Sequence, residues 1–227
     1  MDTNEISKMQ ITRCKINEVD KRGWEWRKEI KTERVSSKIF IKPPWEYYSP
    51  KEGEVVVEIN PGLSFGLGEH ETTRLCIRGM EEVFQKKKVR RVLDAGCGSG
   101  VLSICAAKLG AQMALGFDID PIAVREAKVN AGRNNVSDKV LLFCGESLEG
   151  VKGKFELILA NMPMEVFFYM IEGFRSKLAD GGGLVISGVP ERRKDEAVGW
   201  LEKRGFVLEK EFGEGIWSAF LFIPVVL

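Results

Sequence analysis

The sequence predicts an α/β fold in which a doubly wound, mostly parallel sheet of seven strands has an antiparallel last strand. From about residue 89 onward, apolar runs of strand length alternate with helical patterns, and a short glycine turn joins the last two strands. Alternation of this kind requires right-handed crossovers, which place helices on both faces of a parallel sheet. A connection as short as Gly213–Gly215 permits only a hairpin, so the last strand must run antiparallel to its neighbour.

Seven segments have the apolar composition of buried strands and are bounded by turn residues. In chain order they are Arg91–Asp94, Ala111–Asp118, Lys139–Cys144, Phe155–Ala160, Leu184–Ser187, Phe206–Phe212 and Ile216–Val226. The helices expected between them are Gly100–Leu109, Pro121 to about Asn134, Glu165–Leu178 and Pro190–Arg204. Asp120 is a good N-cap for the second helix, because Pro121 takes its first position. Asp180–Gly183 is expected to be a turn.

Residues 1–60 have a different character, and we expect them to form a short N-terminal β extension that leans on a main domain at 61–227. Arg34–Lys42 and Glu54–Ile59 alternate like half-exposed strands, and three prolines interrupt the chain between them. About 60 residues with such a broken pattern would form only a marginal core alone.

The composition supplies enough apolar material for a core but no strong overall charge. Hydrophobic residues make up 44% of the chain and charged residues 30%, with a formal net charge of +1. Such a balance creates no field that would attract nucleic acid or an anionic membrane. The longest apolar run, Ala219–Leu227, is too short for a membrane span. We therefore expect a cytoplasmic protein that has no membrane or DNA partner and does not bind nucleic acid directly.

The cysteines and the histidine restrict the kinds of site that the chain can build. There are five cysteines, an odd number, and none of them forms a CxxC pair. A disulfide framework or a cysteine zinc site is therefore not expected, and a reducing compartment is. His70 is the only histidine, which argues against histidine-based metal sites, and we expect no metal.

The central motif is the glycine-rich turn Asp94–Gly100, which follows the first strand of the main domain and opens a helix. Glycine lets the backbone turn tightly and approach a ligand without a β-carbon in the way. The GxGxG spacing differs from the GxGxxG of dinucleotide sites. A nicotinamide oxidoreductase is therefore the weakest of the functional hypotheses. Asp118 follows about 20 positions after Gly96, at a strand end, where an acid can accept hydrogen bonds from ribose hydroxyls. The alternative is a glycine turn that only packs a helix against a strand.

A second polar position follows the fourth strand, where the chain reads Asn161-Met162-Pro163. In a doubly wound fold this is the rim of the ligand crevice. An amide held there by a nearby proline offers a fixed oxygen acceptor. The alternative is an asparagine that caps a helix or a turn.

Upstream, the segment Asn60–Arg74 reads NPGLSFGLGEHETTR, with three glycines and a pair of threonines before a helix. Together with the motifs above, it resembles the ribosomal protein L11 methyltransferase family, whose signature is close to Pro-Gly-x-x-Phe-Gly-x-Gly-x-His-x-Thr-Thr. The resemblance extends from about Gly23 to Trp217. The family carries an additional N-terminal substrate-recognition domain, whereas few residues precede the matching region here.

The resemblance implies a Rossmann-like class I methyltransferase that uses S-adenosyl-L-methionine to methylate lysine or N-terminal amines of a protein, with a ribosomal protein as the candidate substrate. It implies that Asn161 is the catalytic residue, which orients the target amine, and that Asp94 binds the cofactor's ammonium group. Related amino methyltransferases carry (Asn/Asp)-Pro-Pro-aromatic at this position, whereas this sequence has only one of the two prolines and has Met164 in place of the aromatic residue. The cofactor-binding positions that follow are Phe65, Gly66, Thr73, Asp94, Gly96, Gly98, Gly100, Asp118 and Asn161.

Several alternatives stay open at this point. The acceptor could be RNA or a small-molecule amine, and the chain could be a non-catalytic module that only binds the cofactor. The local basic run Lys86–Arg91 fits a solvated helix end better than an RNA site. We assign no general base; His70 is a candidate, and a role in packing the loop is equally consistent with its position.

Overall fold

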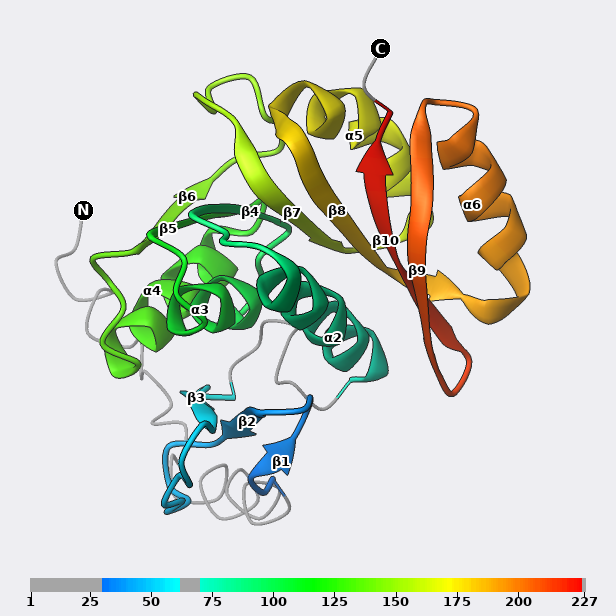
Figure 1. Ribbon diagram of the computed structural model, residues 1–227. Coiled ribbons are helices and arrows are strands. Elements are labelled where there is room, and N and C mark those ends of the chain that lie inside the picture. The colour runs from blue at the N-terminus through cyan, green and yellow to red at the C-terminus, as the bar shows by residue number, and fades with distance from the viewer. Residues whose placement is uncertain (1–29, 62–69, 226–227) are drawn as a thin grey trace, which may run out of the picture. The chain divides into compact units, whose positions relative to one another are not determined.

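A seven-stranded sheet dominates the computed structural model, which describes residues 30–61 and 70–225 (Figure 1). Its strands lie in the order β6-β5-β4-β7-β8-β10-β9. Five of them, β4 to β8, are mutually parallel, and β10 runs antiparallel to both β8 and β9. The strands are β4 (Arg91–Ala95), β5 (Met113–Asp118), β6 (Val140–Cys144), β7 (Phe155–Asn161), β8 (Leu178–Pro190), β9 (Phe206–Glu214) and β10 (Trp217–Pro224). The predicted fold class and the antiparallel last strand are confirmed.

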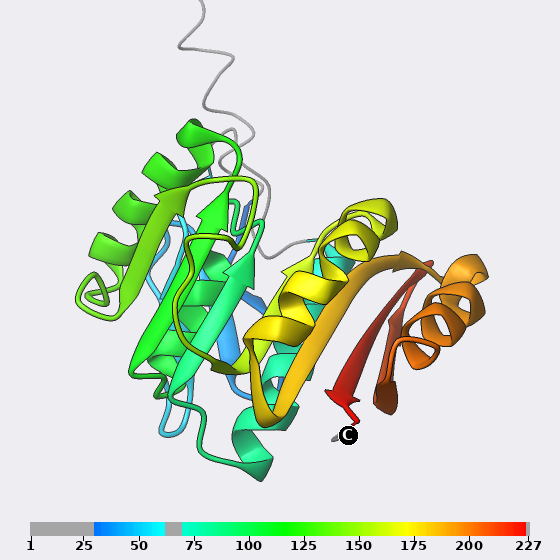
Figure 2. The same cartoon turned by 90° about the horizontal axis from the view of Figure 1, so that it is seen from above.

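Helices cover both faces of this sheet, and each face has its own apolar core. The helices are α2 (Glu71–Lys86), α3 (Val101–Lys108), α4 (Pro121–Arg133), α5 (Met164–Lys177) and α6 (Lys194–Glu202). One core joins the sheet to side chains of α2, α3 and α4, and the other joins it to α5 and α6. Figure 2 shows the two groups of helices on opposite sides of the strands. Within the described residues, no helix is both long and apolar enough to cross a membrane.

The region around Pro190 differs from the sequence prediction. A helix was expected to begin at Pro190, but β8 continues to that residue, which pairs with Trp217 of β10. A 3-10 turn at Glu191–Arg193 then leads into α6. Proline is favoured at the start of a helix, but here the pairing with β10 holds it in extended conformation. The expected turn at Asp180–Gly183 coincides with an irregularity in the pairing of β7 with β8.

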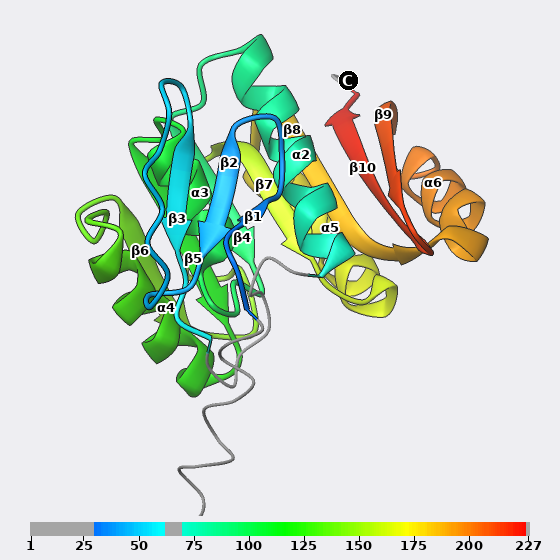
Figure 3. The same ribbon diagram turned by 90° about the horizontal axis from the view of Figure 1, so that it is seen from below.

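The described part of the N-terminal extension contains a second, three-stranded sheet in the order β1-β2-β3 (Figure 3), and from here on the term extension refers to residues 32–61. Its strands are β1 (Glu33–Arg34), β2 (Ile39–Lys42) and β3 (Val55–Glu58). The single strand expected at Arg34–Lys42 is therefore wrong. A turn divides it, because Val35 and Ser36 both donate their N–H to the Ile39 carbonyl and the Ser36 hydroxyl accepts the Ile39 N–H.

The extension packs directly against the larger sheet's helices. Val57 and Ile59 of the extension are buried in the same apolar cluster as Ile77 of α2 and Ile104 of α3. Residues Thr32–Leu227 accordingly form one compact unit. This continuity gives the short extension the core that its own length could not supply.

Candidate functional site

A cavity of about 650 Å³ lies at the carboxyl ends of β4, β5 and β7. The chain passes from β4 to β5 and β6 on one side and returns to β7 on the other. Doubly wound sheets bind their ligands at such a switch point. Five of the predicted site residues line this cavity: Thr73, Gly96, Gly98, Asp118 and Asn161.

The glycine loop forms one wall of the cavity and is held by the end of β5. The N–H of Gly98 donates to Asp118 Oδ2 at 2.9 Å, and Asp118 Oδ1 accepts the N–H of Asp120 at 3.0 Å. Gly96 and Gly98 have φ values of +68° and +50°, in the left-handed region that glycine enters without strain. Asp118 therefore sets the shape of the loop as well as presenting a carboxylate beside it.

Gly100 belongs to the predicted set but lies outside the cavity lining. It is the N-cap of α3 with a φ of +80°, and a Cβ placed on it would lie 2.9 Å from Cβ of Ala127 in α4. The absence of a side chain at Gly100 thus permits close packing of α4 against the start of α3. Sequence spacing alone did not distinguish this role from contact with a ligand.

Asp94 also lies behind the cavity lining, fully buried at the end of β4. Its Oδ2 accepts hydrogen bonds from the N–H and the hydroxyl of Ser103, at 3.0 and 2.7 Å. Its Oδ1 has no hydrogen-bond partner among the described residues. Burial raises the pKa of Asp94 to about 6, with the Ser103 bonds opposing the rise and the charge of Asp118 adding to it.

The opposite wall of the cavity is built by the end of β7 and the first turn of α2. Asn161 Nδ2 donates to Thr73 Oγ1 at 3.3 Å, and Thr73 is fully buried. Because its Nδ2 is used in this contact, Asn161 is left with its carbonyl oxygen as the acceptor for a ligand.

His70 is the N-cap of α2, and its Nδ1 accepts the N–H of Thr72 at 3.3 Å. The same Nδ1 lies 2.8 Å from the hydroxyl oxygen of Thr72. The ring also lies beside Trp217, with centroids 5.6 Å apart. The structure therefore gives His70 a positioning function at the helix terminus.

Other lining residues were not predicted from the sequence as site residues. Trp217 reaches the cavity from the start of β10, and Arg193 from the 3-10 turn after β8. Arg193 Nη1 forms an ion pair with Glu165 Oε1 at 2.7 Å, and bonds to Glu196 and Glu165 raise the pKa of the guanidinium. In the sequence, Trp217 stands out only as part of the family resemblance, and no sequence pattern identifies Arg193 as a site residue.

Two predicted positions, Phe65 and Gly66, lie outside the described residues. Among residues 30–61 and 70–225, no group of three or more histidine, cysteine, aspartate or glutamate side chains could hold a metal ion.

The residues present fit the cofactor that the sequence predicts. A wall without β-carbons at Gly96 and Gly98 allows close approach of a ligand, and the Asp118 carboxylate is suited to a ribose. The buried Asp94 Oδ1, which lacks a partner in the described chain, is suited to a cationic group or a water bound to it. A volume of about 650 Å³ is within the usual range for small-ligand and cofactor sites.

Comparisons with known proteins agree with this geometry. The family model described as ribosomal protein L11 methyltransferase (PrmA) matches residues 2–223. A ribosomal protein L11 methyltransferase from Clostridium botulinum strain Eklund 17B is 39% identical over 211 residues, which cover 92% of this chain and 66% of that protein. One from Halalkalibacterium halodurans is 39% identical over 196 residues, 86% of this chain and 62% of that protein. The chain thus spans slightly less than two thirds of these curated relatives.

A solved structure extends the likeness to three dimensions. The crystal structure of a ribosomal protein L11 methylase from Lactobacillus delbrueckii subsp. bulgaricus superposes with a TM-score of 0.79 at 30% sequence identity. The match covers 86% of this chain and 100% of that chain.

Proposed function

The chain belongs to the ribosomal protein L11 methyltransferase family, and on this premise we propose that it methylates a protein amine with S-adenosyl-L-methionine. The acceptor is a lysine or an N-terminal amine, and ribosomal protein L11 is the first substrate to test. The family uses S-adenosyl-L-methionine. The observation that carries the proposal is the single cavity that joins the glycine loop and Asp118 to the Thr73–Asn161 pair.

The two walls of the cavity have different tasks in this proposal. The glycine loop and Asp118 hold the cofactor's amino-acid and ribose parts, and Asp94 binds its ammonium group. S-adenosyl-L-methionine, when bound, supplies a methyl group that its sulfonium has activated. The protein's own contribution is to bring donor and acceptor into line and to exclude water.

Asn161 is the residue that orients the acceptor. With Nδ2 directed to Thr73 Oγ1, its carbonyl oxygen can accept a hydrogen from the incoming amine and aim the nitrogen lone pair. A lysine amine, with an ordinary pKa of about 10.4, must first lose a proton. Transfer from water into a largely apolar cavity favours the neutral amine. Burial also raises the pKa of the Cys97 thiol within the glycine loop, and the charges of Asp94 and Asp118 add to the rise.

We also place the protein in the cytoplasm. The support is that the cysteines within the described residues, Cys76, Cys97, Cys105 and Cys144, are unpaired, as is usual in a reducing compartment.

The decisive experiment incubates the protein with methyl-labelled cofactor and either purified L11 or a cell extract, followed by protease or nuclease treatment. Label in protease-sensitive material, assigned by peptide mass spectrometry to methyl-lysine or a methylated N-terminus, is the expected result. S-adenosylhomocysteine should suppress it as a competitor. Label only in nuclease-sensitive material would replace the protein acceptor with RNA. Cofactor binding without labelled macromolecule would favour a small-molecule acceptor or a non-catalytic module.

A further inference from the structure

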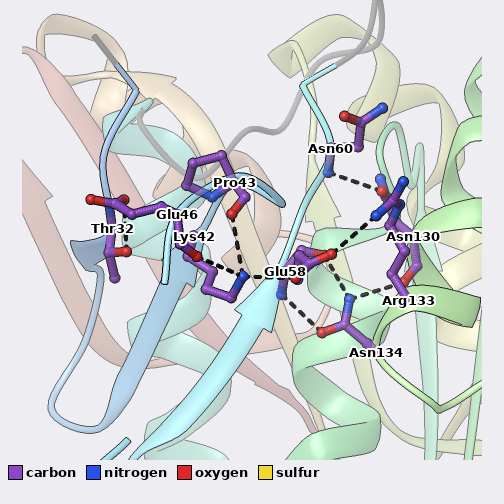
Figure 4. A network of polar contacts seen from close by, with 9 residues as sticks. All are labelled: Thr32, Lys42, Pro43, Glu46, Glu58, Asn60, Asn130, Arg133 and Asn134. Atoms are coloured by element: carbon purple, nitrogen blue, oxygen red, sulfur yellow. Dashed lines mark hydrogen bonds and ion pairs between the residues drawn. The ribbon is translucent and has the colours of Figure 1, made fainter. Parts of the chain in front are cut away.

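Two buried asparagines, Asn130 in the last turn of α4 and Asn134 at the C-cap of that helix, bind the end of the N-terminal extension (Figure 4). Asn134 forms hydrogen bonds with both the N–H and the carbonyl of Glu58. Its Oδ1 accepts the N–H at 2.9 Å, and its Nδ2 donates to the carbonyl oxygen at 2.6 Å. One turn earlier, Asn130 Oδ1 accepts the N–H of Asn60 at 3.0 Å. The exposed fractions of Asn130 and Asn134 are 1% and 5%.

The spacing explains why a helix can pair with this strand. Alternate residues of an extended chain present their N–H groups on one edge, about 6.6 Å apart. Residues four apart on a helix lie about 6 Å apart along its axis. The two side-chain amides therefore occupy the edge of β3 opposite β2, as the backbone of a further strand would.

Asn130 makes one contact that Asn134 lacks. Its Nδ2 donates to the carbonyl of Ser99 at 3.0 Å. Ser99 lies between Gly98 and Gly100, inside the glycine loop. On the cavity side of that loop, the N–H of Gly98 is held by Asp118. The loop is thus fixed from one side by Asp118 and from the other by Asn130.

We propose that Asn130 is a positioning residue whose single buried amide couples the N-terminal extension, through Asn60, to the cofactor-binding glycine loop. This inference rests on the proposed function, which assigns the loop to the cofactor. The orientation of the Ser99–Gly100 peptide determines how the preceding N–H and Cα groups face the cavity. Loss of the Nδ2 donor therefore loosens the loop and lowers cofactor affinity, although Asn130 does not touch the cavity.

Asn130→Asp is the sharpest variant, because it preserves size and keeps an acceptor for Asn60. At a pH where the new carboxyl is ionised, it replaces the donor to Ser99 with an oxygen and places two acceptors against each other. Asn130→Ala removes the hydrogen bonds to both Asn60 and Ser99. It replaces the aspartate variant in the test if that variant does not fold. The matched control is Asn134→Ala, which removes a buried amide from the same helix and the same network without touching the loop.

Titration calorimetry with S-adenosylhomocysteine measures the effect on the site. Both Asn130 variants should weaken binding by about tenfold or more, the size expected for one buried hydrogen bond. Asn134→Ala should stay within about twofold of the wild-type dissociation constant, although thermal unfolding should show it to be destabilised. Equal loss of affinity in Asn130→Ala and Asn134→Ala, or unchanged affinity in the Asn130 variants, would overturn the proposal.

Hydrogen exchange in the ligand-free protein tests the coupling without any cofactor. Asn130→Ala should speed exchange of the amides of both Asn60 and Gly98. Asn134→Ala should speed exchange at Glu58 and leave Gly98 unchanged. If the wild type binds no cofactor, the proposed function fails, and this exchange pattern alone then decides whether the coupling exists. Unaltered exchange at Gly98 in Asn130→Ala would refute the coupling whether or not the cofactor binds.

Discussion

Replacement of Asp94 by asparagine should stabilise the ligand-free protein near neutral pH. The carboxyl group is fully buried, and burial raises its pKa to about 6 from the ordinary 3.8. An acid whose pKa is higher in the folded state is held there preferentially in its protonated form. Ionisation of Asp94 therefore costs stability, and a side chain that cannot ionise avoids that cost.

The magnitude follows from the difference between the two pKa values. Below about pH 4, Asp94 is protonated in both the folded and the unfolded states, and its titration contributes nothing. As the pH rises from about 4 to 6, the unfolded state has already released the proton, so the folded protein loses stability. Above about pH 6 the loss is complete, at about 3 kcal/mol. Asparagine keeps the volume and an oxygen to accept the bonds from Ser103 but cannot ionise, so the stability of Asp94→Asn relative to the wild type should rise by about this amount between about pH 4 and 6.

The assay is reversible urea unfolding of the wild type and Asp94→Asn at several pH values between about 4 and 8. The difference in their free energies of unfolding cancels the titration of groups that the two proteins share. It should rise between about pH 4 and 6 and then remain level. A difference that does not change with pH would refute the argument, because it would mean that the buried carboxyl has an ordinary pKa.

The same variant tests the function assigned to Asp94. If Oδ1 binds the cofactor's ammonium group, the affinity of Asp94→Asn for S-adenosylhomocysteine should be lower by about tenfold or more, because a charge-assisted hydrogen bond is lost. A variant that is more stable and binds equally well would restrict Asp94 to its contact with Ser103. A gain in stability with a loss of affinity would show that the native site maintains a costly buried charge for its ligand.

Three further substitutions test the other parts of the site. Asp118→Ala should weaken S-adenosylhomocysteine binding by about 1.5–3 kcal/mol, measured by calorimetry; unchanged affinity would leave Asp118 with its loop contacts alone. Asn161→Ala should lower the methylation rate much more than it weakens cofactor binding, and an equal fall in both would assign Asn161 to the cofactor. Gly100→Ala should destabilise the protein by about 1–3 kcal/mol more than Gly110→Ala in urea unfolding. Both positions have positive φ, but a Cβ at Gly110 meets nothing within 4 Å, whereas one at Gly100 meets Ala127; equal losses would show that the clash is relieved elsewhere.

The fold could be predicted because its elements are encoded locally, whereas their order in space is not. Most strands of the large sheet have their own apolar run, and the Gly213–Gly215 connection is too short for anything but a hairpin. Nothing local determined that β10 would insert between β8 and β9. That placement depends on which strand has a free edge when the hairpin docks, which is a property of the assembled sheet.

The same division between local and tertiary information explains the errors at the element boundaries. The turn that divides β1 from β2 is formed by Ser36, whose hydroxyl accepts the Ile39 N–H, in a segment whose alternation reads as one strand. Pro190 would suit the start of a helix, but pairing with Trp217 extends β8 through it. In both cases a contact that the periodicity does not encode decided the outcome: a side-chain hydrogen bond at Ser36 and strand pairing at Pro190.

Within the site, residue types were easier to predict than their roles. The glycine spacing marked Gly96, Gly98 and Gly100 together, but only the first two line the cavity. Gly100 instead accommodates Ala127, a contact that depends on where α4 packs. Arg193 reaches the cavity from a turn whose position depends on β8 and β10, so no short motif could have revealed it.

The asparagines of α4 show that a signal for such tertiary roles can nevertheless exist in the sequence. Asparagine is a poor residue for a helix interior, because its side chain competes for backbone hydrogen bonds. Asn130 lies in the last turn of α4, Asn134 is the C-cap of the same helix, and both are buried. A buried amide must find partners or lose stability, and here each finds its partners in the backbone of another segment. Asparagines four apart on the inner face of a helix therefore indicate that a strand edge or a loop lies against that face, and in this protein they identify both.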